Sequence, residues 1–134
     1  MSKEIAIVFG ASGFLGSHVA EALSSAGYQV RLFDRAPSDF KRKDQEMIVG
    51  DIMKLEDVTK AIQGASVVYN FAAIADIDEA NEKPLVTAEI NILGNMNVLE
   101  ASRLAGVSRF IFASSVYVYS ESGSFYRASK QAAE

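Results

Sequence analysis

The sequence contains no cysteine and only one histidine among its 134 residues. The lack of cysteine excludes disulfide bonds and thiolate catalysis, and it is compatible with a reducing, cytoplasmic compartment. The single histidine, His18, has no cluster of histidine, cysteine or acidic residues around it in the sequence. We therefore expect no metal site.

Long apolar runs and a strong net charge are also missing. The formal net charge is only -4, which does not favour a nucleic-acid-binding surface. No apolar stretch is long enough to span a bilayer, and the run at residues 5–9 is too short for a signal peptide. Hydrophobic residues make up 49% of the chain, enough for the core of one domain. We expect one domain without a nucleic-acid or membrane partner.

Segments of strand and helix length alternate along the chain. Apolar runs predict strands, and apolar residues at helical spacing predict helices. The predicted strands are residues 5–9, 29–34, 46–49, 66–71 and 109–113, and the predicted helices are residues 14–26, 54–62, 85–105 and one beginning near 126. Short connections favour right-handed crossovers. The sequence therefore predicts an α/β fold, a Rossmann-type doubly wound parallel sheet.

Two of the predicted helices carry an apolar stripe. The expected inner face of the first consists of Leu15, Val19, Ala22 and Leu23. The stripe of the long helix consists of Ile90, Leu93, Met96 and Leu99. The second stripe is explained equally well by packing on the sheet and by a homodimer contact through helix 85–105.

Three glycines, Gly10, Gly13 and Gly16, follow the first predicted strand and lead into the first predicted helix. Glycine allows a sharp turn and a close approach of the backbone to an anion, and helix N-terminal amides favour negative charge. The spacing differs from the commonest Gly-x-Gly-x-x-Gly fingerprint. A tight turn without a ligand is the alternative, but the strand and helix around it favour a dinucleotide pyrophosphate.

Two aspartates follow predicted strands. The Asp34 carboxylate can accept hydrogen bonds from both ribose hydroxyls of an adenosine and would repel a 2'-phosphate, which favours NAD over NADP. Arg35 complicates this because a guanidinium can offset that repulsion or stack on adenine. Asp51 can accept from the adenine amino group while Ile52 packs on the ring. Asp51 could equally cap the helix that begins near Lys54.

The candidate catalytic residues are Ser115, Tyr126 and Lys130. A free phenol titrates near pH 10, but an ammonium four residues away on a helix favours its ionised form. Lys130 could also hold a ribose hydroxyl, and Ser115 could orient a substrate hydroxyl or carbonyl. An ordinary surface pair is the alternative, but the glycine turn and the serines favour catalysis. Tyr117 and Tyr119 rank lower because neither has a lysine four residues later.

Small and amide side chains leave further alternatives open. The segment Phe71–Ala73 ends the fourth predicted strand, where small residues either let a cofactor lie close or fill the core. Asn91 and Asn95 lie in the predicted long helix, where they either bridge to the catalytic segment as buried amides or face solvent.

Together these segments resemble the extended short-chain dehydrogenase/reductase superfamily, and within it the NAD-dependent epimerase/dehydratase family that acts on nucleotide sugars. The matching segments are Gly10–Gly16, Asp34, Gly50–Ile52, Asn70–Ala73, Asn91–Ala101, Ser114–Tyr117, and Tyr126 with Lys130. In such enzymes the tyrosine takes a proton from a sugar hydroxyl while hydride passes to bound NAD.

The resemblance also implies roles for individual residues. The cofactor-binding residues would be Gly10, Ser12, Gly13, Phe14 and Leu15 at the pyrophosphate, Asp34 and Arg35 at the ribose, Asp51 and Ile52 at the adenine, Phe71, Ala72 and Ala73 beside the nicotinamide half, and Ser114, Tyr126 and Lys130. Ser115, Tyr126 and Lys130 would be the catalytic set, and a nucleotide sugar would be the substrate.

Two departures from the family qualify this expectation. The interval between Ser115 and Tyr126 is shorter than in most relatives, and the chain ends soon after Lys130, where relatives continue into a substrate domain. We therefore expect residues 1–134 to be a truncated NAD-binding domain that is inactive alone, with a sheet incomplete at its C-terminal side. The alternatives are an NAD(P)H-dependent ketone reductase of the same superfamily and a non-catalytic dinucleotide-binding module.

Overall fold

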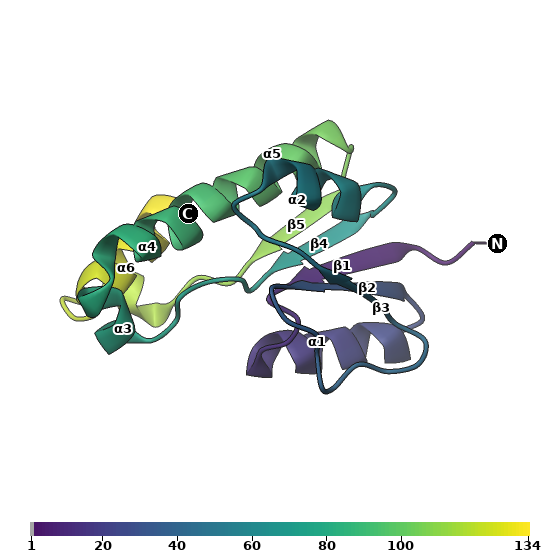
Figure 1. The fold of residues 1–134 in the computed structure, drawn as a ribbon, viewed down its shortest axis with the longest axis horizontal. Coiled ribbons are helices and arrows are strands. Elements are labelled where there is room, and N and C mark those ends of the chain that lie inside the picture. Colours follow the sequence, from purple (N-terminus) through teal and green to yellow (C-terminus); the bar gives the residue numbers. More distant parts are fainter. Residues whose placement is uncertain (1) are drawn as a thin grey trace.

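The computed structural model describes residues 2–134 and contains a five-stranded, all-parallel sheet between helices (Figure 1). The strands are β1 (Ile5–Phe9), β2 (Gln29–Asp34), β3 (Glu46–Val49), β4 (Val67–Asn70) and β5 (Arg109–Phe112). Their order in the sheet is β3-β2-β1-β4-β5, and every neighbouring pair is parallel. This order, with crossovers on both sides of β1, confirms the predicted Rossmann-type α/β fold.

Helices cover both faces of the sheet. Helix α1 (Phe14–Ser25) lies on one face, and helices α2 (Leu55–Ile62) and α5 (Asn95–Leu104) lie on the other (Figure 1). Side chains alternate along each strand, so Ala6 and Val8 pack with α1 whereas Ile7 and Phe9 pack with α2 and α5. The central strand β1 is therefore buried on both faces.

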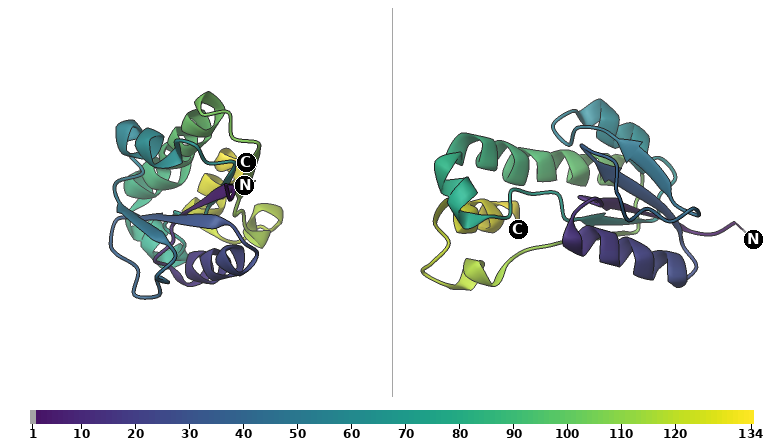
Figure 2. Two further views of the ribbon diagram at one scale, coloured as in Figure 1. Left: turned by 90° about the vertical axis from the view of Figure 1, so that its right-hand side faces the viewer. Right: turned by 60° about the horizontal axis from the view of Figure 1, so that its bottom comes forward.

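A second group of helices lies beyond the carboxyl ends of the strands (Figure 2). This group contains α3 (Ile77–Glu82), α4 (Pro84–Ala88), the π-helix η1 (Glu89–Gly94), the 3-10 turn η2 (Val116–Tyr119) and α6 (Ser124–Ala133). Its apolar core is small, with Ile74, Ala80 and Tyr126 as the buried residues. The group faces the same end of the sheet as the predicted ligand-binding residues.

Several predicted elements differ from the observed ones. The single long helix predicted over residues 85–105 is divided into α4, η1 and α5 by a π-helical segment. The predicted polar loop before Pro84 contains α3, whose N-cap Asp76 accepts a hydrogen bond from the Glu79 N–H at 2.8 Å. Helix α6 begins at Ser124, slightly before the predicted start near residue 126.

The predicted inner face of α1 is partly wrong. Leu23 is buried as expected, but Leu15 and Ala22 are exposed, and Gly16 and Ala20 are buried in their place. The reason is the close contact between Gly16 and the glycine turn, which fixes how the helix is rotated on the sheet.

Three of the four residues in the apolar stripe of the predicted long helix face solvent, whereas Ile90 is half-buried against the cluster of Ile74 and Tyr126. Leu93, Met96 and Leu99 are 49%, 57% and 40% exposed, whereas Asn91 and Asn95 are buried. The wider turn of η1 shifts the phase of the helix relative to uniform α-helical spacing. Packing on the sheet therefore does not explain this stripe.

A substitution of Gly16 tests whether its close contact with the glycine turn sets the rotation of α1 on the sheet. A Cβ at Gly16 would lie 2.2 Å from the Gly10 carbonyl oxygen, whereas a Cβ at Gly13 would lie 3.4 Å from the same atom. We expect Gly16→Ala to lower the free energy of unfolding by about 3 kcal/mol because backbone must move. Gly13→Ala is the matched control, since Gly13 has a φ of -80°. Equal urea midpoints for the two variants would contradict this account.

Candidate functional site

A cleft of about 330 Å³ lies at the carboxyl ends of β1, β2, β3 and β4. Most of the cofactor-binding residues expected from the sequence line it. These are Gly10, Gly13, Asp34, Arg35, Asp51, Ile52, Phe71, Ala72 and Ala73. The fold therefore brings residues from four loops to one cavity, as expected for the crevice of a doubly wound sheet.

The glycine turn forms one wall of the cleft. Gly10 has a φ of +76°, and a Cβ there would lie 2.7 Å from the Ala72 nitrogen. The Gly10 N–H donates to the Phe33 carbonyl at 2.9 Å, which joins β1 to β2 at this point. Gly13 is the N-cap of α1, and no side chain caps this end of the helix. The turn thus presents backbone without side chains to a ligand.

Phe14 and Leu15, which follow the turn, have exposed side chains on the surface of α1. They are absent from the side chains that line the cleft. Only their backbone amides, at the first turn of α1, are placed to contact an anion.

The Asp34 carboxylate is held at the end of β2 by two backbone groups. The Ser12 N–H donates to Oδ2 at 3.0 Å, and the Arg35 N–H donates to Oδ1 at 2.7 Å. Each oxygen keeps a further acceptor position, so the carboxylate can still bind two hydroxyls. The Ser12 hydroxyl donates to the Ala36 carbonyl at 2.7 Å. Ser12 therefore orients Asp34 and the loop after it.

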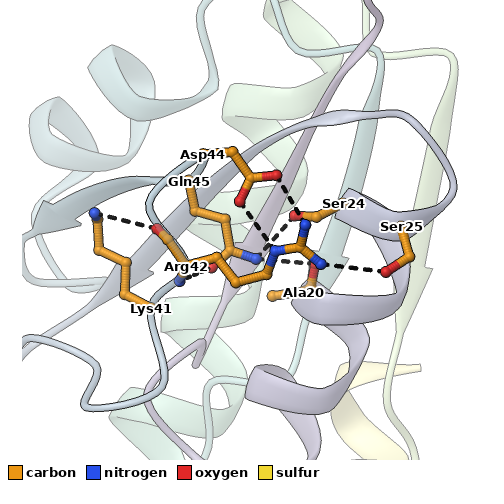
Figure 3. A network of polar contacts seen from close by, with 7 residues as sticks. All are labelled: Ala20, Ser24, Ser25, Lys41, Arg42, Asp44 and Gln45. Atoms are coloured by element: carbon orange, nitrogen blue, oxygen red, sulfur yellow. Dashed lines mark hydrogen bonds and ion pairs between the residues drawn. The ribbon is translucent and has the colours of Figure 1, made fainter.

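The loop that follows Asp34 and Arg35 is fastened to α1 (Figure 3). Gln45 is buried, and its Nε2 donates to the Ala20 carbonyl at 3.2 Å and to the Ser24 hydroxyl at 2.9 Å. Its Oε1 accepts from the Arg42 N–H at 2.9 Å, and the Arg42 guanidinium binds Asp44 through two hydrogen bonds. Gln45 immediately precedes β3, so these contacts hold the loop against the C-terminal half of α1, at the end of the sheet away from the cleft.

Asp51 supports the turn before α2. Its Oδ1 accepts from the Met53 N–H at 2.9 Å, while Lys54 is the N-cap of the helix. Asp51 therefore does not cap α2 directly, unlike the alternative considered from the sequence. Ile52 is buried, lines the cleft and packs close to Gly94.

Lys130 projects from α6 toward the end of β5. The residue is 4% exposed, and its Nζ donates to the Ala113 carbonyl at 2.9 Å and lies 4.9 Å from the centre of the Phe112 ring. Burial lowers the pKa of Lys130 to about 8 from its ordinary 10.5. The same Nζ lies 5.9 Å from the centre of the Tyr126 ring. The structure thus brings the predicted tyrosine and lysine together.

Tyr126 and Ser115 are connected through Tyr117. The Tyr126 ring stands edge-on to the Tyr117 ring, with the centres 6.2 Å apart, and the Ser115 hydroxyl accepts from the Tyr117 N–H at 3.2 Å. Within residues 2–134, no hydrogen bond links Ser115, Tyr126 and Lys130 directly to one another. None of the three lines the 330 Å³ cleft. Ser114 donates to the Glu134 carboxylate at 2.5 Å.

Buried amides tie this region together. Asn91 accepts from the Ile74 N–H at 2.7 Å, and its Nδ2 donates to the Ile74 carbonyl and to the Ser129 hydroxyl, each at 3.0 Å. Asn95 accepts from the Nδ2 of Asn70 at 2.8 Å. The alternative of buried, bridging amides at Asn91 and Asn95 is therefore confirmed over the solvent-facing one.

Sequence reasoning missed several residues of this region. Asn70 ends the buried strand β4, and Ser129 lies between Tyr126 and Lys130. Their positions in the sequence could therefore have indicated that both residues belong to this region. The remaining side chains of the cleft carried no such signal. They are Phe33, Met53, Ile74, Val86, Glu89 and Ile90.

Within residues 2–134, no group of three or more histidine, cysteine or acidic side chains is placed to hold a metal ion. Over the same range, no helix has both the length and the apolar character needed to cross a membrane.

Comparison with known proteins gives relatives of two enzyme types. A 3-beta-hydroxysteroid dehydrogenase of Mycolicibacterium neoaurum is 34% identical over 114 residues, covering 81% of this chain and 31% of the relative. A UDP-glucose 4-epimerase of Rhizobium leguminosarum bv. trifolii is 29% identical over 124 residues, covering 89% of this chain and 38% of the relative. The chain thus spans about a third of the length of these two relatives.

Solved structures and a family model agree with this similarity. The UDP-glucose 4-epimerase of Thermus thermophilus in complex with NAD matches with a TM-score of 0.86 and 30% identity, over 96% of this chain and 48% of that one. The UDP-glucose 4-epimerase of Thermotoga maritima with UDP-glucose matches with a TM-score of 0.89 and 25% identity, over 96% and 48%. The family model described as "NAD dependent epimerase/dehydratase family" matches residues 6–133. The chain therefore belongs to the NAD dependent epimerase/dehydratase family.

Proposed function

We propose that this chain is the NAD-binding domain of an enzyme that acts on nucleotide sugars, with Ser115, Tyr126 and Lys130 as its catalytic residues. One observation carries the proposal: the cleft places the Asp34 carboxylate beside the glycine turn at Gly10 and Gly13. Because the chain spans 31% to 48% of the relatives named above, we assign it the cofactor site and the catalytic helix. We place the substrate domain outside residues 1–134.

The lining of the cleft fits a dinucleotide. Gly10 and Gly13 would let a pyrophosphate approach the backbone because they carry no side chains, and the first amides of α1 would offer it N–H groups. The Asp34 carboxylate would accept from the ribose hydroxyls, and Asp51 with Ile52 would hold the adenine. Phe71, Ala72 and Ala73 would lie along the nicotinamide half.

The same geometry favours NAD over NADP. Asp34 carries a negative charge where a 2'-phosphate would lie, so the phosphate would be repelled. Arg35 lines the cleft as well, and its guanidinium would reduce this repulsion without reversing it. The NAD complex of the Thermus thermophilus relative supports this choice.

Three residues would carry the chemistry. NAD held in the cleft would supply a hydride acceptor in its oxidised form and a hydride donor in its reduced form. Tyr126, as the phenolate, would take the proton of the sugar hydroxyl. The Lys130 ammonium, 5.9 Å from the centre of the Tyr126 ring, would stabilise the phenolate. Ser115 would orient the hydroxyl by a hydrogen bond. On this account residues 1–134 bind NAD but need the substrate domain for turnover.

A second candidate is a reductase or dehydrogenase of a steroid-like substrate. The 34% identity to the 3-beta-hydroxysteroid dehydrogenase exceeds the 29% identity to the epimerase from Rhizobium. Such an enzyme would change the net amount of reduced cofactor, whereas an epimerase returns its hydride to the product. Absorbance at the reduced-nicotinamide band during turnover separates the two.

Calorimetric titration with NAD and with NADP tests the cofactor assignment. Asp34→Asn keeps an acceptor for the Ser12 N–H but removes the charge. We expect it to weaken NAD binding about tenfold and to narrow the preference over NADP. Asp44→Asn is the control, because Asp44 pairs with Arg42 on the exposed loop. An unchanged NAD preference in Asp34→Asn would rule out the role of Asp34.

Replacing Tyr126 tests the catalytic assignment in the protein extended to the length of its relatives. We expect Tyr126→Phe to lower the rate of UDP-glucose to UDP-galactose conversion by about 100-fold or more, since the proton acceptor is lost. NAD binding should change far less than the rate, because the contacts at Asp34 and at the glycine turn are kept. Tyr119→Phe is the control because Tyr119 is fully on the surface. Full activity in Tyr126→Phe would remove Tyr126 from the mechanism.

We also propose that a second copy of the chain covers the exposed stripe of Leu93, Met96 and Leu99. Leu104, 63% exposed, extends the same stripe along α5. Several large apolar side chains exposed on neighbouring turns of η1 and α5 are typical of a protein interface.

The oligomeric state tests this surface directly. Light scattering after gel filtration should give a dimer for the natural sequence and a monomer for Met96→Glu, because a carboxylate would be buried in the contact. Phe40→Glu is the control, since it changes an exposed aromatic on the loop beside α1. A monomeric natural sequence, or equal loss in both variants, would argue against the contact.

A further inference from the structure

Asn95 is the first residue of α5 and is 2% exposed. Its side chain lies between two segments that are distant in sequence, the end of β4 and the last turn of α6. Its Oδ1 accepts from Asn70 Nδ2 at 2.8 Å, and its Nδ2 donates to the Ala133 carbonyl at 3.2 Å. A carbonyl only accepts, so the side-chain amide has one possible orientation.

Asn70 continues this connection to the cleft. Asn70 is 1% exposed, and its Oδ1 accepts from the Ala72 N–H at 3.1 Å. Ala72 lines the cleft, and its nitrogen would lie 2.7 Å from a Cβ placed on Gly10. An unbroken series of hydrogen bonds therefore runs from the cleft wall through Asn70 and Asn95 to α6.

Helix α6 depends on such polar contacts for its position. Of its residues, Tyr126 alone belongs to the small apolar cluster with Ile74 and Ala80. Lys130 is attached to the Ala113 carbonyl and Ser129 to Asn91. The bond from Asn95 to Ala133 holds the turn of α6 that follows Lys130. An apolar residue at position 95 would leave the Asn70 amide without its partner.

We infer that Asn95 is a positioning residue that fixes the Tyr126 and Lys130 face of α6 relative to the cofactor cleft. The inference rests on the proposed role of these two residues. Asn95 acts through Ala133 and Asn70 and does not itself reach the reacting atoms. Breaking its contacts should let α6 move away from β5 and expose the Lys130 ammonium to water.

Competitive acetylation of Lys130 by trace acetic anhydride, followed by mass spectrometry of its peptide, measures this movement. The titration midpoint of Lys130 should lie near 8 in the natural sequence, where burial disfavours the charged form. In Asn95→Leu we expect the midpoint to rise by about one unit, because the ammonium becomes hydrated. The Tyr126 ring lies 5.9 Å from the Lys130 Nζ, so the series is repeated in the Tyr126→Phe background.

Val98→Ala is the matched control. Val98 is buried on the same helix, but it packs against the sheet in the cluster of Ile7 and Phe9. Val98→Ala should lower the melting temperature and leave the Lys130 midpoint unchanged. If Asn95→Leu does not fold, Asn95→Ser, which is too short to reach Ala133, takes its place with the same expected shift.

The outcomes separate the inference from the proposed function. A raised midpoint in the Asn95 variant and an unchanged one in Val98→Ala support the positioning role. Equal midpoints in all variants, or equal shifts in both, overturn it. The measurement needs neither NAD nor a substrate. Failure of NAD to bind would overturn the proposed function and leave this result standing.

Discussion

The close approach of backbone at the glycine turn is the constraint on which the rest of the structure depends. Gly10 lies against the Phe71–Ala72 backbone, and Gly16 lies against the Gly10 carbonyl. These contacts bring the ends of β1 and β4 together with the start of α1. The turn thereby rotates α1 so that Leu15 faces solvent. It also places the Ser12 N–H on the Asp34 carboxylate. One packing requirement thus sets both the core and the cleft.

The two halves of the molecule are held together by different forces. The sheet and its helices bury large side chains such as Ile7, Phe9 and Phe33, and this apolar core supplies most of the stability. The helices beyond the strand ends have a smaller apolar cluster and use buried amides at Asn91 and Asn95 instead. Hydrogen bonds are directional, so they specify position more narrowly than apolar contact does.

This division explains what the sequence could predict. The bounds of β1 follow from its apolar run, because a buried parallel strand needs little else. Strand β2 and the edge strand β3 are less buried, and their bounds follow from shorter apolar patterns. Asp34 and Ala72 were predictable as cleft residues because they lie at the carboxyl ends of predicted strands. The π-helix Glu89–Gly94 was not predictable from periodicity, since its extra residue per turn is stabilised by tertiary contacts. Val86 and Glu89 reach the cleft for the same reason: only the folded chain brings them there.

The buried amides Asn91 and Asn95 determine which face of η1 and α5 is exposed to solvent. Because Asn91 and Asn95 must face Ile74, Asn70 and α6, the residues on the far side of the helix must face water. Those residues include Leu93 and Met96, which would otherwise have been available to the core. The same helix orientation therefore both fixes the position of α6 and leaves the apolar stripe exposed to solvent. A substitution that rotated Leu93 and Met96 toward the core would break the hydrogen bonds of Asn91 and Asn95. Helix α6, which carries Tyr126 and Lys130, would then lose its fixed position.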